Sequence, residues 1–334
     1  MSNYEETDKI NKIISNSKKI LIIQADNPDG DSLGSALALE QIISDLGKEP
    51  ILYCSVDMPT YLRYLAGWDR VSNDIPNDFD AAIIVDTSSE SLLEKMTKNG
   101  KRSIIGSKPL IVLDHHTTEA NIVGASVICN KKVVSTGELI YELSQELDWP
   151  LNLTAKNMIV SSTMSDSLGL TSEATTARSI AIISELVEGG VVMADLENKR
   201  RELMKKSQRI LKYKGELIKR IEYYDEGRIA LILIPWDEIE QYSHEYNPSM
   251  LVIDEMRMVE DVVIAIALKT YKNSRVTGKI RCNYGHAIAD KVAEAFGGGG
   301  HKYASGFKIE DVADISELKA KLIEKTTKLL ESIN

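Results

Sequence analysis

Four short apolar runs in the first third of the chain each end in polar residues, and this pattern constrains the fold most strongly. They lie at 18–24, 49–55, 80–88 and 109–116. Runs of this length, rich in isoleucine and valine, are typical of buried strands. Helical patterns lie between or after them, notably at 33–47, 136–147 and 153–169. This alternation of strand and helix predicts a mostly parallel sheet covered on both faces.

The second half predicts a separate α/β domain. Strands are expected at 228–235, 262–271 and 276–283, and a glycine-rich stretch at 297–309 leads into another. Helices are expected at 287–296 and 315–333. We therefore predict an α/β fold in three parts: a first domain at 1–190, a helical linker at 191–220, and a second, smaller α/β domain at 221–334 across a cleft.

The predicted linker is rich in lysine and arginine. Its cations, in the helical segment 194–220 that follows Gly189 and Gly190, include Lys199, Arg200, Arg201, Lys205, Lys206 and Arg209. A solvated helix face accounts for such charges, and a basic wall facing an anionic substrate is the alternative.

Charge and cysteine content narrow the functional classes. A net charge of −10 over 334 residues argues against general electrostatic binding to long nucleic acid, including long duplexes, but permits a small anion at a local site. The three cysteines, Cys54, Cys129 and Cys282, are far apart and form no CxxC. That spacing favours a reduced, cytoplasmic setting. The polar start is unlike a secretory signal, and no apolar run approaches the roughly 20 residues that span a membrane, so no membrane partner is expected.

Polar groups stand where the predicted strands end. They are Asp29 and Asp31, then Asp86, then Asp114, His115 and His116, with Asp166 added from a helix end or loop. The carboxyl ends of strands in an open parallel sheet meet at one edge, where ligands usually bind. Converging carboxylates repel one another unless they are protonated or bind cations. Oxygen and imidazole ligands suit Mn²⁺ or Mg²⁺.

A pair of ions is a natural extension of this pattern, because a shared carboxylate holds two cations about 3.5–4 Å apart. Gly30 permits a sharp turn that sends Asp29 and Asp31 to different ions. Each piece also has an ordinary structural explanation. A DGD sequence is often a turn, an aspartate after a strand is often a helix N-cap, and paired histidines can be surface or packing residues. The combination after successive strands favours the metal site.

These residues resemble the DHH phosphoesterase family. The resemblance lies in "NPDGDSLGS" at 27–35, "VDTS" at 85–88, "LDHH" at 113–116 and "TMSDSLGL" at 163–170. The second half resembles the first type of DHH-associated domain through "GGGGHKYASGF" at 297–307. That element separates the chain from manganese pyrophosphatases and exopolyphosphatases that share the first domain. The length is similar to the nanoRNase, pAp-phosphatase and dinucleotide phosphodiesterase branch, and leaves no room for the extra domains of RecJ-like exonucleases.

The resemblance implies roles for residues in both halves. Metal ligands would be Asp29 on one ion, Asp31, His115 and Asp166 on the other, and Asp86 bridging both; the ions would be Mn²⁺, with Mg²⁺ as the alternative. The catalytic residues would be His116, which contacts the scissile phosphate, and Asp114, which orients a histidine. Substrate binding would fall to Arg281, Gly298, Gly299, Gly300 and His301.

One position departs from the family pattern. Members usually carry a metal-binding histidine three residues before the motif proline, and here Pro28 places Ala25 at that position. Gln24 and Asp26 flank Ala25, yet neighbouring strand residues point to opposite faces, so neither is an assured substitute. Asn27 offers a carbonyl oxygen. The first ion could therefore bind weakly, another residue could replace the histidine, or catalysis could have been lost while nucleotide binding remained.

The resemblance implies metal-dependent hydrolysis of short oligonucleotides (nanoRNA, linear or cyclic dinucleotides), of pAp, or of both, to mononucleotides. A nucleotide-binding sensor that does not cut its ligand is the main alternative, and a single-strand exonuclease is another. Small two-domain enzymes often pair, so a homodimer is also open. His244 and His286 are interpreted as surface or capping residues.

Overall fold

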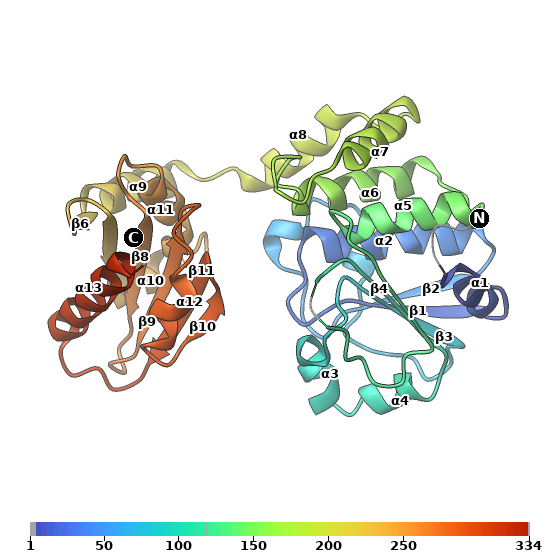
Figure 1. Cartoon of the computed structure of the whole chain (residues 1–334), viewed down its shortest axis with the longest axis horizontal. Coiled ribbons are helices and arrows are strands. Elements are labelled where there is room, and N and C mark those ends of the chain that lie inside the picture. Colours follow the sequence, from blue (N-terminus) through green and yellow to red (C-terminus); the bar gives the residue numbers. More distant parts are fainter. Residues whose placement is uncertain (1–4, 118, 333–334) are drawn as a thin grey trace. The chain divides into compact units, whose positions relative to one another are not determined.

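The computed structural model describes residues 5–117 and 119–332 and divides the chain into two compact units (Figure 1). The first unit ends at Lys205 and the second begins at Lys206. Within the described ranges, no helix has both the length and the apolar character needed to cross a bilayer.

The first unit is built on five parallel strands. They are β1 (Lys19–Ile23), β2 (Glu49–Tyr53), β3 (Ala81–Val85), β4 (Leu110–Asp114) and β5 (Val127–Asn130). Their order across the sheet is β2-β1-β3-β4-β5, and every neighbouring pair is parallel. The predicted parallel α/β sheet is therefore confirmed. The short strand β5 was not predicted, because four residues carry too little pattern to distinguish a strand from a loop.

Helices cover both faces of this sheet (Figure 1). Ile20 and Ile22 of β1 pack into one core cluster, whereas Leu21 and Ile23 pack into the other, because strand side chains alternate. The first cluster is covered by α1 (Thr7–Ser15), α2 (Gly30–Asp45), α5 (Thr136–Glu146), α6 (Leu153–Asp166), α7 (Ala177–Glu188) and α8 (Met193–Met204). The second is covered by α3 (Glu94–Lys98) and α4 (Arg102–Gly106). Short 3₁₀ turns occupy Thr60–Leu62, Trp68–Arg70 and Glu90–Leu93.

Glycines let α2 approach α6 closely. A Cβ atom on Gly30 would lie 2.2 Å from the Ser165 hydroxyl, and one on Gly34 would lie 2.9 Å from Ser162 Cβ. Gly30 is the first residue of α2, three residues earlier than the expected helix start. A larger side chain at this position would clash with Ser165. This close contact, rather than a sharp turn, explains why a glycine stands between Asp29 and Asp31. The close packing brings the first turn of α2 against the last turn of α6.

The second unit contains a mixed sheet in the order β10-β11-β9-β8-β7-β6. Its strands are β6 (Glu222–Tyr224), β7 (Ile229–Ile234), β8 (Ile264–Thr270), β9 (Val276–Cys282), β10 (Gly299–His301) and β11 (Ala304–Ile309). Only β7 and β8 are a parallel pair among these strands. The expected second, smaller α/β domain is confirmed as a fold.

The two faces of this sheet are covered to different extents. One face carries α12 (Ala289–Glu294) and α13 (Ile315–Glu331), which share a core cluster with residues of β7, β8, β9 and β11. The other carries α9 (Gln208–Lys219), α10 (Trp236–Tyr242) and α11 (Pro248–Arg257). The core cluster on that second face draws its strand residues from β7 and β8 alone. Among the described residues, none from β9, β10 or β11 belongs to that cluster, although Met250 of α11 reaches Lys279 on β9.

The basic segment between the units is helical, but it is divided. Helix α8 ends at Met204 and α9 begins at Gln208, where the Ser207 side chain accepts a hydrogen bond from the Ile210 N–H and caps the new helix. Arg200 and Arg201 both pair with Glu197 on α8. These contacts fit the solvated-face interpretation of the charges.

Candidate metal centre

The strand ends of the first unit bring three carboxylates around one imidazole. His115 follows β4, and its Nε2 atom lies 3.4 Å from Asp31 Oδ2, 3.5 Å from Asp86 Oδ1 and 3.2 Å from Asp166 Oδ2. Asp31 comes from the first turn of α2, Asp86 from the end of β3 and Asp166 from the last residue of α6. Residues from four separate elements thus meet at a single atom.

A backbone carbonyl fixes the orientation of the His115 ring on the side away from the carboxylates. Its Nδ1 lies 3.3 Å from the Val133 carbonyl oxygen. A carbonyl only accepts, so Nδ1 carries the proton and Nε2 turns its lone pair toward the carboxylates. Nε2 is buried and has no hydrogen-bond partner within the described part of the chain. A lone pair facing carboxylate oxygens is unfavourable unless a cation lies between them, so this donor set fits a divalent metal ion.

Asp31 is completely buried and held by donors from three helices, α2, α5 and α6. Its Oδ2 accepts from the Thr136 N–H at 2.8 Å, and Oδ1 accepts from the Gly137 N–H at 3.3 Å and the Ser35 hydroxyl at 3.0 Å. The Ser162 hydroxyl also donates to Oδ1. Thr136 and Gly137 open α5, where unpaired N–H groups favour negative charge. The N-terminus of α5 therefore directs two N–H donors at the Asp31 side chain.

Asp86 sits in a strained backbone conformation at the end of β3. Its φ of 62° is left-handed, which is uncommon for a residue other than glycine. Its N–H donates to the Leu113 carbonyl at 2.9 Å, and the Thr136 hydroxyl donates to Oδ1 at 3.2 Å. Burial and the charges of Asp31 and Asp29 raise the pKa of Asp86 well above its ordinary value.

Asp166 is also repelled by the neighbouring carboxylates. Burial, and then the charge of Asp31, raise its pKa to about 6, while His115 opposes the shift. Its side chain is one-third exposed (33%), so it lies at the mouth of the cluster. Two sets of groups lie close enough to hold an ion, and they share His115: Asp31, His115 and Asp166, and Asp86, His115 and His116.

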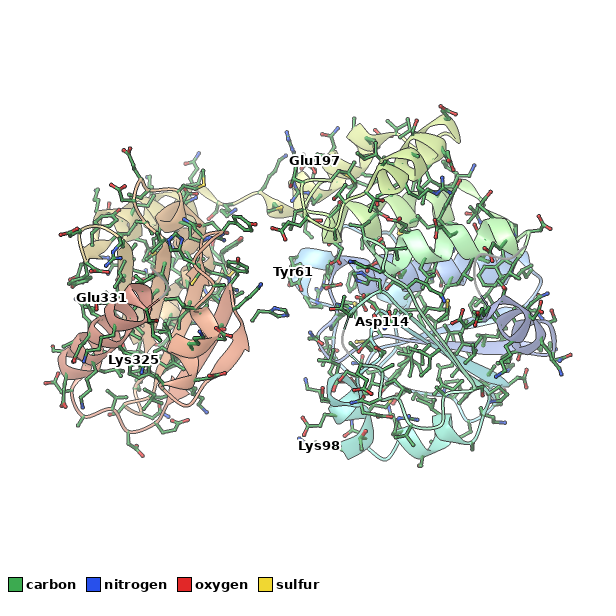
Figure 2. All side chains as sticks on the ribbon, in the orientation of Figure 1. Tyr61, Lys98, Asp114, Glu197, Lys325 and Glu331 are labelled. Carbon is green, nitrogen blue, oxygen red and sulfur yellow. The ribbon has the colours of Figure 1, made fainter. Side chains whose placement is uncertain are left out.

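Asp114 and His116 form a hydrogen-bonded pair beside the cluster. Asp114 is fully buried inside the first unit (Figure 2), and its Oδ1 accepts from His116 Nδ1 at 2.8 Å and from the His115 N–H at 2.9 Å. Burial alone would raise the pKa of Asp114, but the hydrogen bond from His116 helps hold it below its ordinary value. The same bond raises the pKa of His116. The His116 ring is half-exposed, so its Nε2 faces outward from the pair.

Asp29 has a structural role that the N-cap alternative anticipated. Its Oδ1 accepts from the Asp31 and Ser32 N–H groups, both at 3.0 Å, and caps α2. Its charge also contributes to the raised pKa of Asp86, so the Asp29 carboxylate belongs electrostatically to the same cluster. Sequence reasoning missed Thr136, whose "STGE" context is an ordinary N-cap signal for α5.

Among the described residues, the neighbours of Ala25 in the chain, Gln24, Asp26 and Asn27, differ in burial and contacts. Ala25 is 5% exposed. Asp26 turns toward other elements, accepting from the Ser55 hydroxyl and from the Lys95 N–H at 2.7 Å, and Asn27 is exposed. Gln24 is buried next to the first turn of α2, 3.5 Å from the Ser32 hydroxyl, and its amide nitrogen has no hydrogen-bond partner among the described residues.

The other predicted site residues lie in the second unit. Arg281 is on β9, opposite Ala304 of β11, and His301 of β10 pairs with the same Ala304. Gly299 and His301 are exposed. A Cβ on Gly298 would lie 2.2 Å from the Gly306 carbonyl, and Gly300 has a φ of 139° and a close approach to Ala304. Packing against β11 is thus sufficient to explain why glycine stands at 298 and 300.

Comparisons with known proteins agree with this geometry. Residues 19–168 match the model of the DHH family, N-terminal domain. The chain is 23% identical over 301 residues to a protein of Thermus thermophilus named bifunctional oligoribonuclease and PAP phosphatase NrnA, covering 89% of this chain and 86% of the relative.

Two solved structures share the fold. An exopolyphosphatase-related protein from Bacteroides fragilis superposes with a TM-score of 0.84 at 20% identity, covering 98% of this chain and 97% of that one. RecJ from Thermus thermophilus, in complex with Mn²⁺, gives a TM-score of 0.55 at 15% identity and covers 98% of this chain and 54% of that one. At these identities the similarity shows the fold.

Proposed function

Residues 19–168 are a DHH-family domain, and from that premise we propose that the chain is a metal-dependent phosphoesterase. Its substrates would be short oligonucleotides, dinucleotides or pAp, which it would hydrolyse to mononucleotides. The observation that carries the proposal is the buried Nε2 of His115, which lacks a hydrogen-bond partner in the described chain and faces three carboxylates. The name of the Thermus thermophilus relative supports the substrate class.

Asp31, His115 and Asp166 would hold one divalent cation, and Asp86, together with Asp29, would hold a second. When bound, these cations neutralise the converging carboxylates and polarise a phosphorus–oxygen bond toward attack by water. We propose Mn²⁺ as the ion because oxygen and imidazole ligands suit it and because a RecJ structure of the same fold contains Mn²⁺. Mg²⁺ is the alternative that a metal titration would distinguish.

The residues beside the cluster have separable tasks. Asp114 holds His116 through Nδ1, which leaves Nε2 free to donate a hydrogen bond to a phosphate oxygen. Because Asp114 raises the pKa of His116, the ring retains its proton to higher pH than an isolated histidine. This charge would stabilise negative charge developing on the phosphate. In the second unit, Arg281, His301 and the loop 298–300 would bind the nucleotide.

The test is hydrolysis of a small panel containing pAp, pApA, cyclic di-AMP and a five-nucleotide RNA, with Mn²⁺ or Mg²⁺ added to metal-free protein. We expect turnover of at least one of these and release of mononucleotide. Asp86→Asn should abolish it, whereas Asp57→Asn, an exposed aspartate of the same unit, should not. Absence of turnover with both metals and all four substrates would contradict the proposal. A single-strand exonuclease would instead remain active on long oligomers.

A second function is favoured by one observation, the buried methyl group of Ala25 at the position where the family pattern has a metal-binding histidine. Asp26 is turned away, with its side chain held by Ser55 and Lys95, so it does not replace the histidine of the family pattern. A chain of this kind could act as a nucleotide sensor that binds without cutting. Tight binding of a panel member without turnover would identify the sensor, and Ala25→His would then be expected to introduce or increase hydrolysis.

A further inference from the structure

Strand β9 of the second unit's sheet carries two half-buried cations that lack carboxylate partners in the described chain. Lys279 and Arg281 lie on β9 two residues apart, so both side chains project from the same face. The Lys279 ammonium donates to the Met250 sulfur at 2.8 Å, and Arg281 Nη1 donates to the Ile280 carbonyl at 2.8 Å. Within the described residues neither forms an ion pair. Both therefore retain capacity for an anion.

The cross-strand neighbours of these cations are small. Arg281 lies opposite Ala265 on one side and Ala304 on the other, and Lys279 lies opposite Ala267 and Gly306. The next strand continues both rows. The partners of Ala304 and Gly306 on β10 are His301 and Gly299, which are exposed. Short side chains therefore flank the two cations on both neighbouring strands.

A third cation adds to the positive charge of this surface. Lys269 of β8 lies on the same face, opposite Thr277. We call Lys269, Lys279 and Arg281 the basic face. Burial, followed by the charges of Arg281 and Lys269, lowers the pKa of Lys279. Asp254 of α11 is the carboxylate that counteracts this repulsion, but its side chain is 68% exposed and lies 3.5 Å from Arg257.

We propose that Lys279 is a second phosphate-binding residue beside Arg281, so that the second unit selects nucleotides carrying two phosphates. Alternate residues of a strand are about 6–7 Å apart, which allows the two cations to bind separate anionic groups of one ligand. A 3′,5′-bisphosphonucleoside or a 5′-phosphorylated dinucleotide presents two such groups, whereas a mononucleotide presents one. The inference relies on the proposed function for the identification of the ligand as a nucleotide.

Binding to the full-length protein in EDTA tests this inference without any hydrolysis. Isothermal titration calorimetry would compare adenosine 3′,5′-bisphosphate with AMP. Lys279→Met should weaken binding of the bisphosphate about tenfold, as expected for loss of a charge-assisted hydrogen bond, and change AMP binding by less than about twofold. Lys279→Arg should retain most of the preference. Lys321→Met, on α13 over the opposite face, is the matched control and should behave like the unchanged protein.

Thermal unfolding separates a ligand-binding lysine from a structural one. Because the fold disfavours the charge on Lys279, Lys279→Met should leave the melting temperature unchanged or raise it while binding weakens. Equal losses for bisphosphate and AMP, no loss for either, a lowered melting temperature, or no bisphosphate binding by the unchanged protein would each overturn the inference. Selective loss in a protein that hydrolyses nothing would support it and refute only the proposed function.

Discussion

The acidic cluster of the first unit and the basic face of the second are both groups of like charges, yet the protein holds them differently. Asp31, at the centre of the acidic cluster, accepts hydrogen bonds from two N–H groups of α5 and from serines of α2 and α6. Lys279 is half-buried and donates to a methionine sulfur, with no carboxylate partner among the described residues. The first arrangement is rigid and suited to an ion with strict ligand geometry. The second leaves its charges free to adjust to a flexible anion.

The two units accommodate like charges in different ways. Carboxylates in the first unit converge because separate strand ends and helix ends bring them together, and donors from outside the cluster anchor Asp29, Asp31 and Asp86. Cations in the second unit lie on the neighbouring strands β8 and β9, and all three are half-buried. Four predictions test this contrast, from the largest expected effect to the smallest.

Asp31→Asn should have the largest effect. The amide keeps the size of the side chain but replaces one metal-binding oxygen with a donor that faces the N–H groups of Thr136 and Gly137. We expect hydrolysis of the best panel substrate to fall by roughly 10³-fold, since the ion supplies several kcal/mol of transition-state stabilisation. Mn²⁺ titration calorimetry should show the loss of the tighter site. Unchanged metal binding would remove Asp31 from the ligand set.

Asp114→Asn should reduce turnover by about 10–100-fold, the range for residues that orient a reactive imidazole. The variant loses the carboxylate that raises the pKa of His116, so the His116 titration midpoint should fall. Because a raised histidine pKa keeps the charged form to higher pH, the variant should lose that charge earlier as pH increases. NMR of the imidazole protons measures the midpoint directly. A midpoint that does not move would contradict the proposed pairing.

Asp166→Asn should stabilise the metal-free protein by about 1 kcal/mol. A shift from 3.8 to about 6 corresponds to about 3 kcal/mol, and we reduce this value because the side chain is one-third exposed. An acid whose folded pKa is raised destabilises the fold fully above pH 6, and the penalty disappears as pH falls toward 4. Melting temperatures of variant and unchanged protein in EDTA should therefore differ most at pH 8 and converge near pH 4.

The same substitution should reverse sign when metal is added. Mn²⁺ stabilises the folded protein that binds it, so the unchanged protein should gain more from added Mn²⁺ than the variant. Equal gains would indicate that Asp166 does not contact the ion. Asp57→Asn serves as the control and should show neither the pH-dependent difference nor the altered response to Mn²⁺.

Asp254→Asn should have the smallest effect, about a twofold gain in affinity for adenosine 3′,5′-bisphosphate. The substitution removes the carboxylate that partly neutralises the basic face, and exposed charges contribute up to about 1 kcal/mol. The gain in affinity should shrink as the salt concentration is raised from roughly 20 mM to roughly 200 mM, because ions screen exposed charges. Calorimetry in EDTA measures it. Weaker binding in the variant would contradict a repulsive role for Asp254.

The sequence by itself determined the fold class and the segments that carry the chemistry. Apolar runs that end at Asp86 and at Asp114 predict buried parallel strands. The carboxyl ends of such strands meet at one edge of the sheet, which brings these residues together. The weak elements escaped prediction: β5 has four residues, and α3 and α4 have five each, too short for a periodic pattern.

Only the tertiary structure decided how each candidate residue is used. It turned His115 Nε2 toward the carboxylates through Val133, gave Asp29 a capping role and placed Thr136 behind Asp31 and Asp86. It also placed Lys279 beside Arg281 on a sheet face where Met250 of α11 reaches Lys279. Such facts depend on contacts between residues far apart in the chain, and local sequence patterns carry no information about their distances or directions.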